Sequence, residues 1–331
     1  MINNVNFVFF GTDEFSVRVL ETLKGKGLTP KLIITIPDKP QGRKMVMTPP
    51  LVKVWGEKNG VAVMQLASLK GPEFSKSFFA ELNATSENLT QSSPKSDLAT
   101  RDTTSVRSWD FFLVASYGKI IPPEILDIPT KGTLNIHPSL LPKYRGPSPL
   151  ETAILNGDTE TGVTIIKLDA EMDHGPILAS ESLNLSSPRP ELGTNAGQGI
   201  PLFNFEQLRD KTAELGTNLL IKILPDYLTD KIEEQEQDHN QATYTKKFVK
   251  EDGLLGQNDL PLTNYRKILA LNPWPGTYLD YPGPAGKIRV IVKQAHLEGE
   301  QLIYDRVTPA GKKEMAWTDF LNGFKVGTKS N

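Results

Sequence analysis

The chain contains no cysteine among its 331 residues. Disulfides, thiolate nucleophiles and cysteine-ligated zinc sites are therefore excluded. Only four histidines are present, so imidazole chemistry rests on few side chains, and a metal site would have to use histidine and carboxylates. Because no HExxH sequence occurs either, nothing here predicts a bound metal.

Long apolar runs are also missing. No stretch approaches the roughly 20 apolar residues that a membrane-spanning helix needs. The N-terminus lacks a basic segment followed by an apolar signal core. We therefore expect a cytoplasmic protein with no membrane partner, and we expect it to act as a monomer. With 38% hydrophobic and 23% charged residues, the composition is that of a globular protein, long enough for two domains.

The net charge of −2 is unevenly distributed. Residues 241–331 hold 13 Lys and Arg against 9 Asp and Glu, an excess of +4, so the other residues carry −6. A basic terminal region on an acidic body is consistent with a polyanionic partner. A solvated lysine-rich surface would produce the same count, so charge alone leaves both interpretations open.

Continuous apolar runs predict buried strands. They are too apolar to have one face in water, and helical segments separate several of them. The pattern indicates an α/β fold with a mostly parallel sheet covered on both faces, in which ligands bind beyond the carboxyl ends of the strands. The runs lie at Val5–Phe10, Lys31–Ile36, Phe111–Ser116, Gly132–Ile136 and Gly162–Leu168.

Polar stretches divide the chain. Residues 83–108 and 186–201 contain few apolar side chains, so we predict surface insertions there. The acidic run at 233–238 predicts an exposed linker, and the alternating runs KIRVIVKQ and QLIYDRV beyond it predict a small β domain. The expected domains are 1–232, a linker at 233–245, and 246–331.

The stretch LNIHPSLLPKYRG places two polar side chains at the end of a predicted strand. Residues two apart in a strand point to the same face, so Asn135 and His137 are expected to project together. An amide and an imidazole that converge on one space can hold the oxyanion that develops in acyl transfer. The alternative interpretation is that Asn135 caps a turn and His137 is a satisfied, half-buried histidine.

A second polar group lies in KLDAEMDHGPIL. Asp169 is expected to satisfy loop amides, whereas Asp173 lies deeper in the turn and could orient His137 and stabilise its charge. His174 is interpreted as a loop residue, and His239 and His296 have no comparable neighbours in the sequence. The turn GTDEF after the first strand lacks GxGxxG spacing and does not predict a dinucleotide site.

Recognisable motifs extend over nearly the whole chain: GTDEF, IPDKPQGR, VASYGKIIP, LNIHPSLLPKYRGPSPLETAILNGDTETGVTI, MDHGPIL, NPWPGTY and PAGKKEMAWTDFLNG. Together they resemble the methionyl-tRNA formyltransferase family, within the folate-dependent formyltransferase superfamily. The central motif, which begins at LNIHPSLLP, is shared by folate-dependent formyltransferases and hydrolases, whereas the last two motifs are specific to the tRNA enzymes. The resemblance implies a Rossmann-like α/β catalytic domain followed by a small OB-like β-barrel that binds tRNA.

The resemblance also implies the reaction: a formyl group passes from 10-formyltetrahydrofolate to the α-amino group of methionyl-initiator tRNA, without a metal. The family's catalytic residues fall on Asn135 and His137, which would hold the oxyanion, and on Asp173, which would orient His137 and assist proton transfer. The implied binding residues are Ser139, Leu140, Leu141 and Pro142 for folate, and Arg43, Lys44, Lys246 and Lys247 for tRNA.

Beside Asp173 the chain reads MDHGP where many family members have LDTGD, so the groups flanking this carboxylate differ. Three other functions share part of the pattern. A sugar-nucleotide N-formyltransferase would use the same three residues, and a hydrolase would release formate without an amine acceptor. A non-catalytic tRNA-binding protein would bind RNA with a steep salt dependence and would not bind folate.

Overall fold

The computed structural model describes residues 5–42, 45–69, Phe78, Leu82, 109–187, 199–283 and 286–326, except the side chains of 324–326. The chain forms two compact units. Residues 1–145, 163–181 and 210–242 form the first, and residues 146–162, 182–209 and 243–331 form the second. The domain boundaries expected from the sequence stay predictions.

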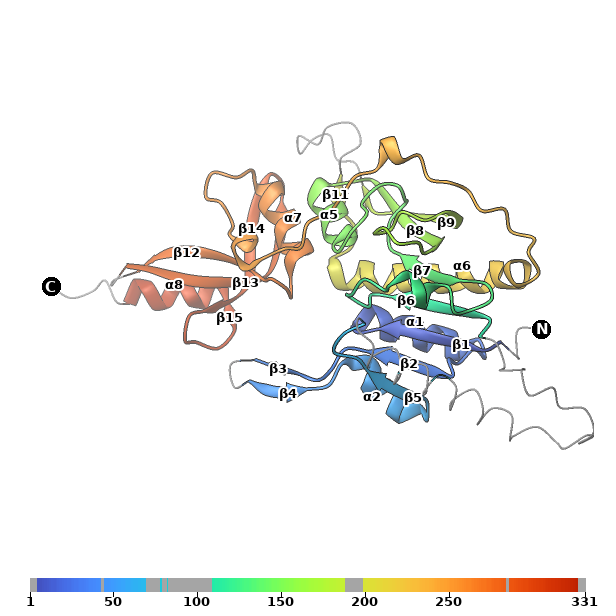
Figure 1. The fold of residues 1–331 in the computed structure, drawn as a ribbon. Coiled ribbons are helices and arrows are strands. Elements are labelled where there is room, and N and C mark those ends of the chain that lie inside the picture. The colour runs from blue at the N-terminus through green and yellow to red at the C-terminus, as the bar shows by residue number, and fades with distance from the viewer. Residues whose placement is uncertain are drawn as a thin grey trace, which may run out of the picture. The chain divides into compact units, whose positions relative to one another are not determined.

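A mostly parallel sheet dominates the first unit (Figure 1). Within the described residues it has seven strands, in the order β5-β2-β1-β6-β7-β8-β9. The pairs from β5 to β7 are parallel and β7 pairs with β8 antiparallel, which confirms the predicted sheet. The strands are β1 (Phe7–Gly11), β2 (Leu32–Thr35), β5 (Ala62–Gln65), β6 (Phe111–Ala115), β7 (Thr133–His137), β8 (Glu160–Lys167) and β9 (Ile177–Asn184).

Both faces of the central strands of this sheet are buried, as β1 illustrates. Phe7 and Phe9 join one apolar core, and Val8 and Phe10 join the other. Because alternate side chains of the strand enter two cores, the sequence is continuously apolar and does not alternate. The helices with residues in these cores are α1 (Glu14–Gly25), α2 (Leu51–Asn59), α4 (Pro123–Leu126) and α6 (Phe205–Leu228).

The second unit contains an antiparallel sheet, which confirms the predicted β structure. In the part of the chain that the structure describes, its four strands are β12 (Thr277–Gly283), β13 (Gly286–Glu298), β14 (Gln301–Pro309) and β15 (Met315–Ala316). Among the described residues, the α-helices wholly within this unit are α5 (Pro149–Asn156), α7 (Pro261–Leu271) and α8 (Trp317–Val326). The sequence did not predict α7 or α8. Closure into an OB-like barrel stays a prediction.

The polar insertions are only partly described. Residues 83–108 lie outside the described residues, and so does 188–198 of the second insertion. Its flanks pair as β10 (Ser186–Ser187) and β11 (Ile200–Pro201). A hairpin of β3 (Lys39–Gln41) and β4 (Val46–Thr48) flanks Arg43 and Lys44, which also lie outside the described residues. Short 3₁₀ helices span His239–Gln241 and Lys250–Gly253. None of the described helices is long and apolar enough to cross a membrane.

Helix α6 comes close to the sheet at Gly216. A Cβ at this position would lie 2.5 Å from Ile136 Cγ2 on β7 and 2.7 Å from Val163 Cγ1 on β8. Both distances are too short for carbon atoms in contact, so a glycine is needed for this approach.

We predict that Gly216→Ala lowers the free energy of unfolding by about 1–3 kcal/mol, because the added methyl overpacks the core beneath the site strands. Chemical denaturation would measure it. The matched control is Gly25→Ala at the end of α1, where an added Cβ meets nothing within 4 Å. Equal effects of the two substitutions would contradict the packing argument.

Candidate active site

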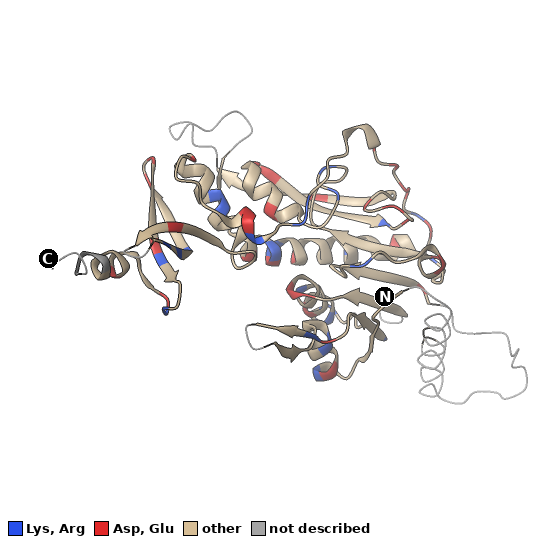
Figure 2. Cartoon of the chain, turned by 60° about the vertical axis from the view of Figure 1, so that its left-hand side comes forward, with Lys and Arg blue, Asp and Glu red and all other residues tan. Residues whose placement is uncertain are grey.

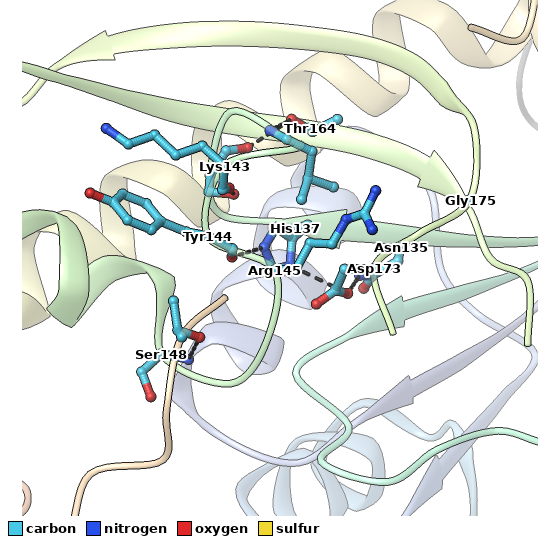
Figure 3. A network of polar contacts seen from close by, with 12 residues as sticks. Asn135, His137, Lys143, Tyr144, Arg145, Ser148, Thr164, Asp173 and Gly175 are labelled. Carbon is cyan, nitrogen blue, oxygen red and sulfur yellow. Dashed lines mark hydrogen bonds and ion pairs between the residues drawn. The ribbon is translucent and has the colours of Figure 1, made fainter. Parts of the chain in front are cut away.

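Three polar side chains converge at the carboxyl end of β7. Asn135 Nδ2 donates a long hydrogen bond of 3.4 Å to Asp173 Oδ1, and His137 Nδ1 lies 3.5 Å from the same oxygen. Asn135 and His137 are only 8% and 4% exposed, so these contacts are largely shielded from solvent. Figure 3 shows the Asp173 carboxylate beside both side chains. The two residues expected to point to one face do so, and the structure brings Asp173 to them.

The loop after β8 turns Asp173 back toward β7. Residue 173 has a φ of 51°, in the left-handed region that a non-glycine residue adopts infrequently. Gly175 packs against the Lys167 carbonyl so closely that a Cβ would lie 2.0 Å from the oxygen. This tight turn brings the Asp173 carboxylate, on the loop that follows the antiparallel neighbour β8, back to Asn135 and His137 on β7.

The imidazole of His137 has a defined orientation. Its Nε2 lies 2.9 Å from the carbonyl oxygen of Tyr144, which can only accept a hydrogen bond, so Nε2 carries a proton. The nitrogen that faces Asp173 is therefore Nδ1. Neutral His137 presents an acceptor there, and only the imidazolium can donate from Nδ1 to an oxyanion.

The backbone of the predicted folate loop, Ser139 to Pro142, is hydrogen-bonded to the side chain of Thr164. The Thr164 hydroxyl donates to the Ser139 carbonyl at 2.7 Å and accepts from the Leu141 amide at 3.1 Å. The Ser139 hydroxyl is fully buried and donates to the Lys143 carbonyl. Leu141 is buried as well, so Leu140 and Pro142 are the partly exposed members of this loop. The arrangement fixes the backbone that follows His137.

Asp13 in the GTDEF turn caps α1 by accepting from the Ser16 amide, and it also accepts from the Ser116 hydroxyl. Burial raises the pKa of this carboxyl, while the hydrogen bond from Ser116 lowers it. These contacts give Asp13 a structural role at the carboxyl ends of β1 and β6.

The predicted tRNA residues are only partly described, because Arg43 and Lys44 lie outside the described residues. Lys246 Nζ lies 2.5 Å from Asp252 Oδ1 and also lies over the ring of Phe248. The side chain of Lys247 is exposed. Figure 2 shows both basic and acidic segments along the ribbon near the C-terminus. The positive charge of this unit is therefore mixed with negative charge.

Sequence reasoning missed a group of residues around the site. Arg145 and Gln237 are buried and hydrogen-bonded to each other, although Gln237 falls in the run predicted to be an exposed linker. The sequence showed no comparable neighbours for His239, and in the structure its ring stacks on His174. Gln237 lies in a run of six polar residues, 233–238, so no apolar pattern in the sequence indicates that its side chain is buried.

The formyl transferase family matches residues 4–187 of the chain. A methionyl-tRNA formyltransferase of Chloroflexus aggregans is 38% identical over 279 residues, which is 84% of this chain and 77% of the relative. That of Herpetosiphon aurantiacus is 35% identical over 350 aligned positions, covering 97% of this chain and 98% of the relative. The chain belongs to the methionyl-tRNA formyltransferase family.

This membership confirms the resemblance and assigns the chain to a family of enzymes. A solved structure of HypX from Aquifex aeolicus in complex with tetrahydrofolic acid has the same fold, with a TM-score of 0.59 and 14% identity over 98% of this chain and 48% of that one. In this member of the formyltransferase family, no group of three or more His, Asp or Glu among the described residues is placed to hold a metal ion.

We predict that Thr164→Val lowers the free energy of unfolding by about 1–3 kcal/mol, because it leaves two buried backbone groups without their hydroxyl partner. The change keeps the side-chain volume, so chemical denaturation would report the lost hydrogen bonds. Thr217→Val is the control, since the fully buried Thr217 hydroxyl only donates back to Ala213 within α6. A Thr164→Val protein no less stable than the control would contradict this role.

Proposed function

We propose that the chain transfers the formyl group of 10-formyltetrahydrofolate to the α-amino group of methionyl-initiator tRNA. The observation that carries the proposal is the convergence of Asn135, His137 and Asp173 at one strand end, in a chain that belongs to this family. An amide, an imidazole and a carboxylate are the groups that amide-forming acyl transfer needs.

In the proposed mechanism the neutral amine attacks the formyl carbon and forms a C–N bond. The carbonyl oxygen becomes an oxyanion, held by Asn135 Nδ2 and by the Nδ1 proton of His137 in its imidazolium form. Asp173 orients that imidazolium and takes up the amine proton, directly or through water. Collapse then breaks the bond between the formyl carbon and N10 of the folate, and N10 leaves with the proton that Asp173 took from the amine.

The tetrahydrofolate donor is supported by the family and by the folate-bound structure of similar fold. We propose that the loop Ser139–Pro142 contacts it, with Leu140 and Pro142 offering side-chain surface and Ser139 holding the loop. Because the formyl group is already activated on the donor, positioning and charge stabilisation suffice and the proposal includes no metal.

The tRNA acceptor is supported by the relative from Herpetosiphon aurantiacus, whose match spans 97% of this chain, the second unit included. We propose that Lys246, Lys247, Arg43 and Lys44 contact the RNA. Such contacts to phosphates are salt-dependent, so binding should weaken as the salt concentration rises.

The direct experiment is formylation of charged initiator tRNA with the folate donor, compared at one salt concentration with charged elongator methionyl-tRNA. A small amino sugar nucleotide and a reaction without any amine test the sugar-modifying and hydrolytic alternatives. Deletion of residues 246–331 would be a poor substitute, because α7 packs on α5 and its removal would uncover that helix.

We predict that Asn135→Ala lowers kcat for formylation by about a hundred- to a thousandfold, because one oxyanion donor is lost. His137→Ala should cost at least as much, since it removes the second donor and the partner of Asp173. The control is His296→Ala, a 53%-exposed histidine paired with Asp305 in the second unit. Near-normal turnover by His137→Ala would sink the assigned roles.

A further inference from the structure

The backbone of Asp173 is held by a buried glutamine from a distant part of the chain. Gln237 Nε2 donates to the Asp173 carbonyl at 2.9 Å and to the Gly175 carbonyl at 2.7 Å. One amide group thus spans the turn that gives Asp173 its left-handed φ. Without these donors, both carbonyls would lose a partner in a largely buried place.

Arg145 determines which way this glutamine points. Its Nε and Nη2 donate to Gln237 Oε1 at 3.1 and 2.7 Å. A guanidinium has no acceptor, so the amide oxygen must face Arg145 and the amide nitrogen must face the loop carbonyls. Both side chains are buried, so little water is available to replace either contact.

Arg145 also supports the loop of Asp173 through a second route, by way of His239 and His174. Arg145 Nη2 donates to His239 Nδ1 at 2.9 Å, and the His239 ring stacks on His174 with 4.0 Å between centroids and 3° between planes. The Nδ1 atom of His174 in turn lies 2.6 Å from Asp169 Oδ2. Residues on both sides of the Asp173 side chain are thus fixed by Arg145 and its partners.

Arg145 also follows directly on Tyr144, whose carbonyl fixes His137 Nε2. Adjacent residues therefore hold the two ends of one contact: the Tyr144 backbone holds His137, and the Arg145 side chain, through Gln237, holds Asp173. The 3.5 Å separation of His137 Nδ1 and Asp173 Oδ1 depends on both.

We propose that Arg145 and Gln237 are positioning residues for formyl transfer, which hold the Asp173 loop so that its carboxylate faces His137 and Asn135. The inference rests on the proposed function of this site. Neither residue is assigned a contact with substrate, and a displacement of a catalytic group by about 1 Å is enough to lower the rate of an enzyme strongly.

The test is Gln237→Glu, which keeps the shape and an acceptor for Arg145 but replaces the donor to the two loop carbonyls with an oxygen. We expect kcat to fall by about ten- to a hundredfold, with KM for both substrates changed by less than about twofold and the melting temperature lowered, because the two loop carbonyls lose their donor. The matched control is Gln235→Glu, the same change on the same segment at an exposed side chain. It should behave as wild type.

The energetic coupling between Gln237 and Asp173 distinguishes a positioning role from a merely structural one. In an Asp173→Asn background, Gln237→Glu should lower the residual single-turnover rate far less than in the wild-type chain, because the carboxylate it positions is already gone. An equal loss in both backgrounds would overturn the inference, as would a wild-type kcat for Gln237→Glu. Should that variant fail to fold, Gln237→Asn takes its place with the same readouts, because it keeps the amide on a shorter side chain.

The outcomes separate this inference from the proposed function. If the wild-type chain does not formylate methionyl-tRNA, the proposed function fails and the inference falls with it. If the wild-type chain formylates and the Gln237 variants match the Gln235 control, only the inference fails.

Discussion

The chemistry proposed for this chain depends on a single carboxylate oxygen. Asp173 Oδ1 lies within 3.5 Å of both the Asn135 amide nitrogen and the His137 Nδ1, and the last two groups are almost fully buried. In such surroundings an electrostatic contact is stronger than in water, and an error in its geometry costs more. The surrounding structure must therefore hold these three groups firmly in place.

The scaffold fixes each partner by a separate means. Strand pairing fixes the positions of Asn135 and His137, because β7 is hydrogen-bonded between β6 and β8. Alternate residues of a strand share a face, so the two side chains point the same way. The carbonyl of Tyr144 fixes the imidazole tautomer, and the turn from Asp169 to Gly175 aims the carboxylate. Thr164 links the strand that precedes this turn to the loop that follows His137. Rigid elements thus carry the donors, while the acceptor lies on a loop that needs its own support.

The parallel sheet and the pairing of Asn135 with His137 were predictable from the sequence because both follow from local rules. A continuously apolar run such as Val5–Phe10 indicates burial on two faces, and the two-residue period of a strand puts positions 135 and 137 together. The role of Gln237 was not predictable. Its partners Arg145 and Asp173 are 92 and 64 residues away in the chain, and its acidic surroundings resemble a solvated linker. The helix α7 was missed because the alternating strands around it dominated the pattern of that region.

The central claim is that Asn135, His137 and Asp173 act together on one carbonyl carbon. The most direct measurement is the single-turnover formylation rate of Asp173→Asn and His137→Ala, alone and combined. Residues that act as one unit lose the same stabilisation once, so we expect the combined loss to fall well below the product of the two single losses. A combined loss equal to that product would show that the two residues act independently, and would contradict the account.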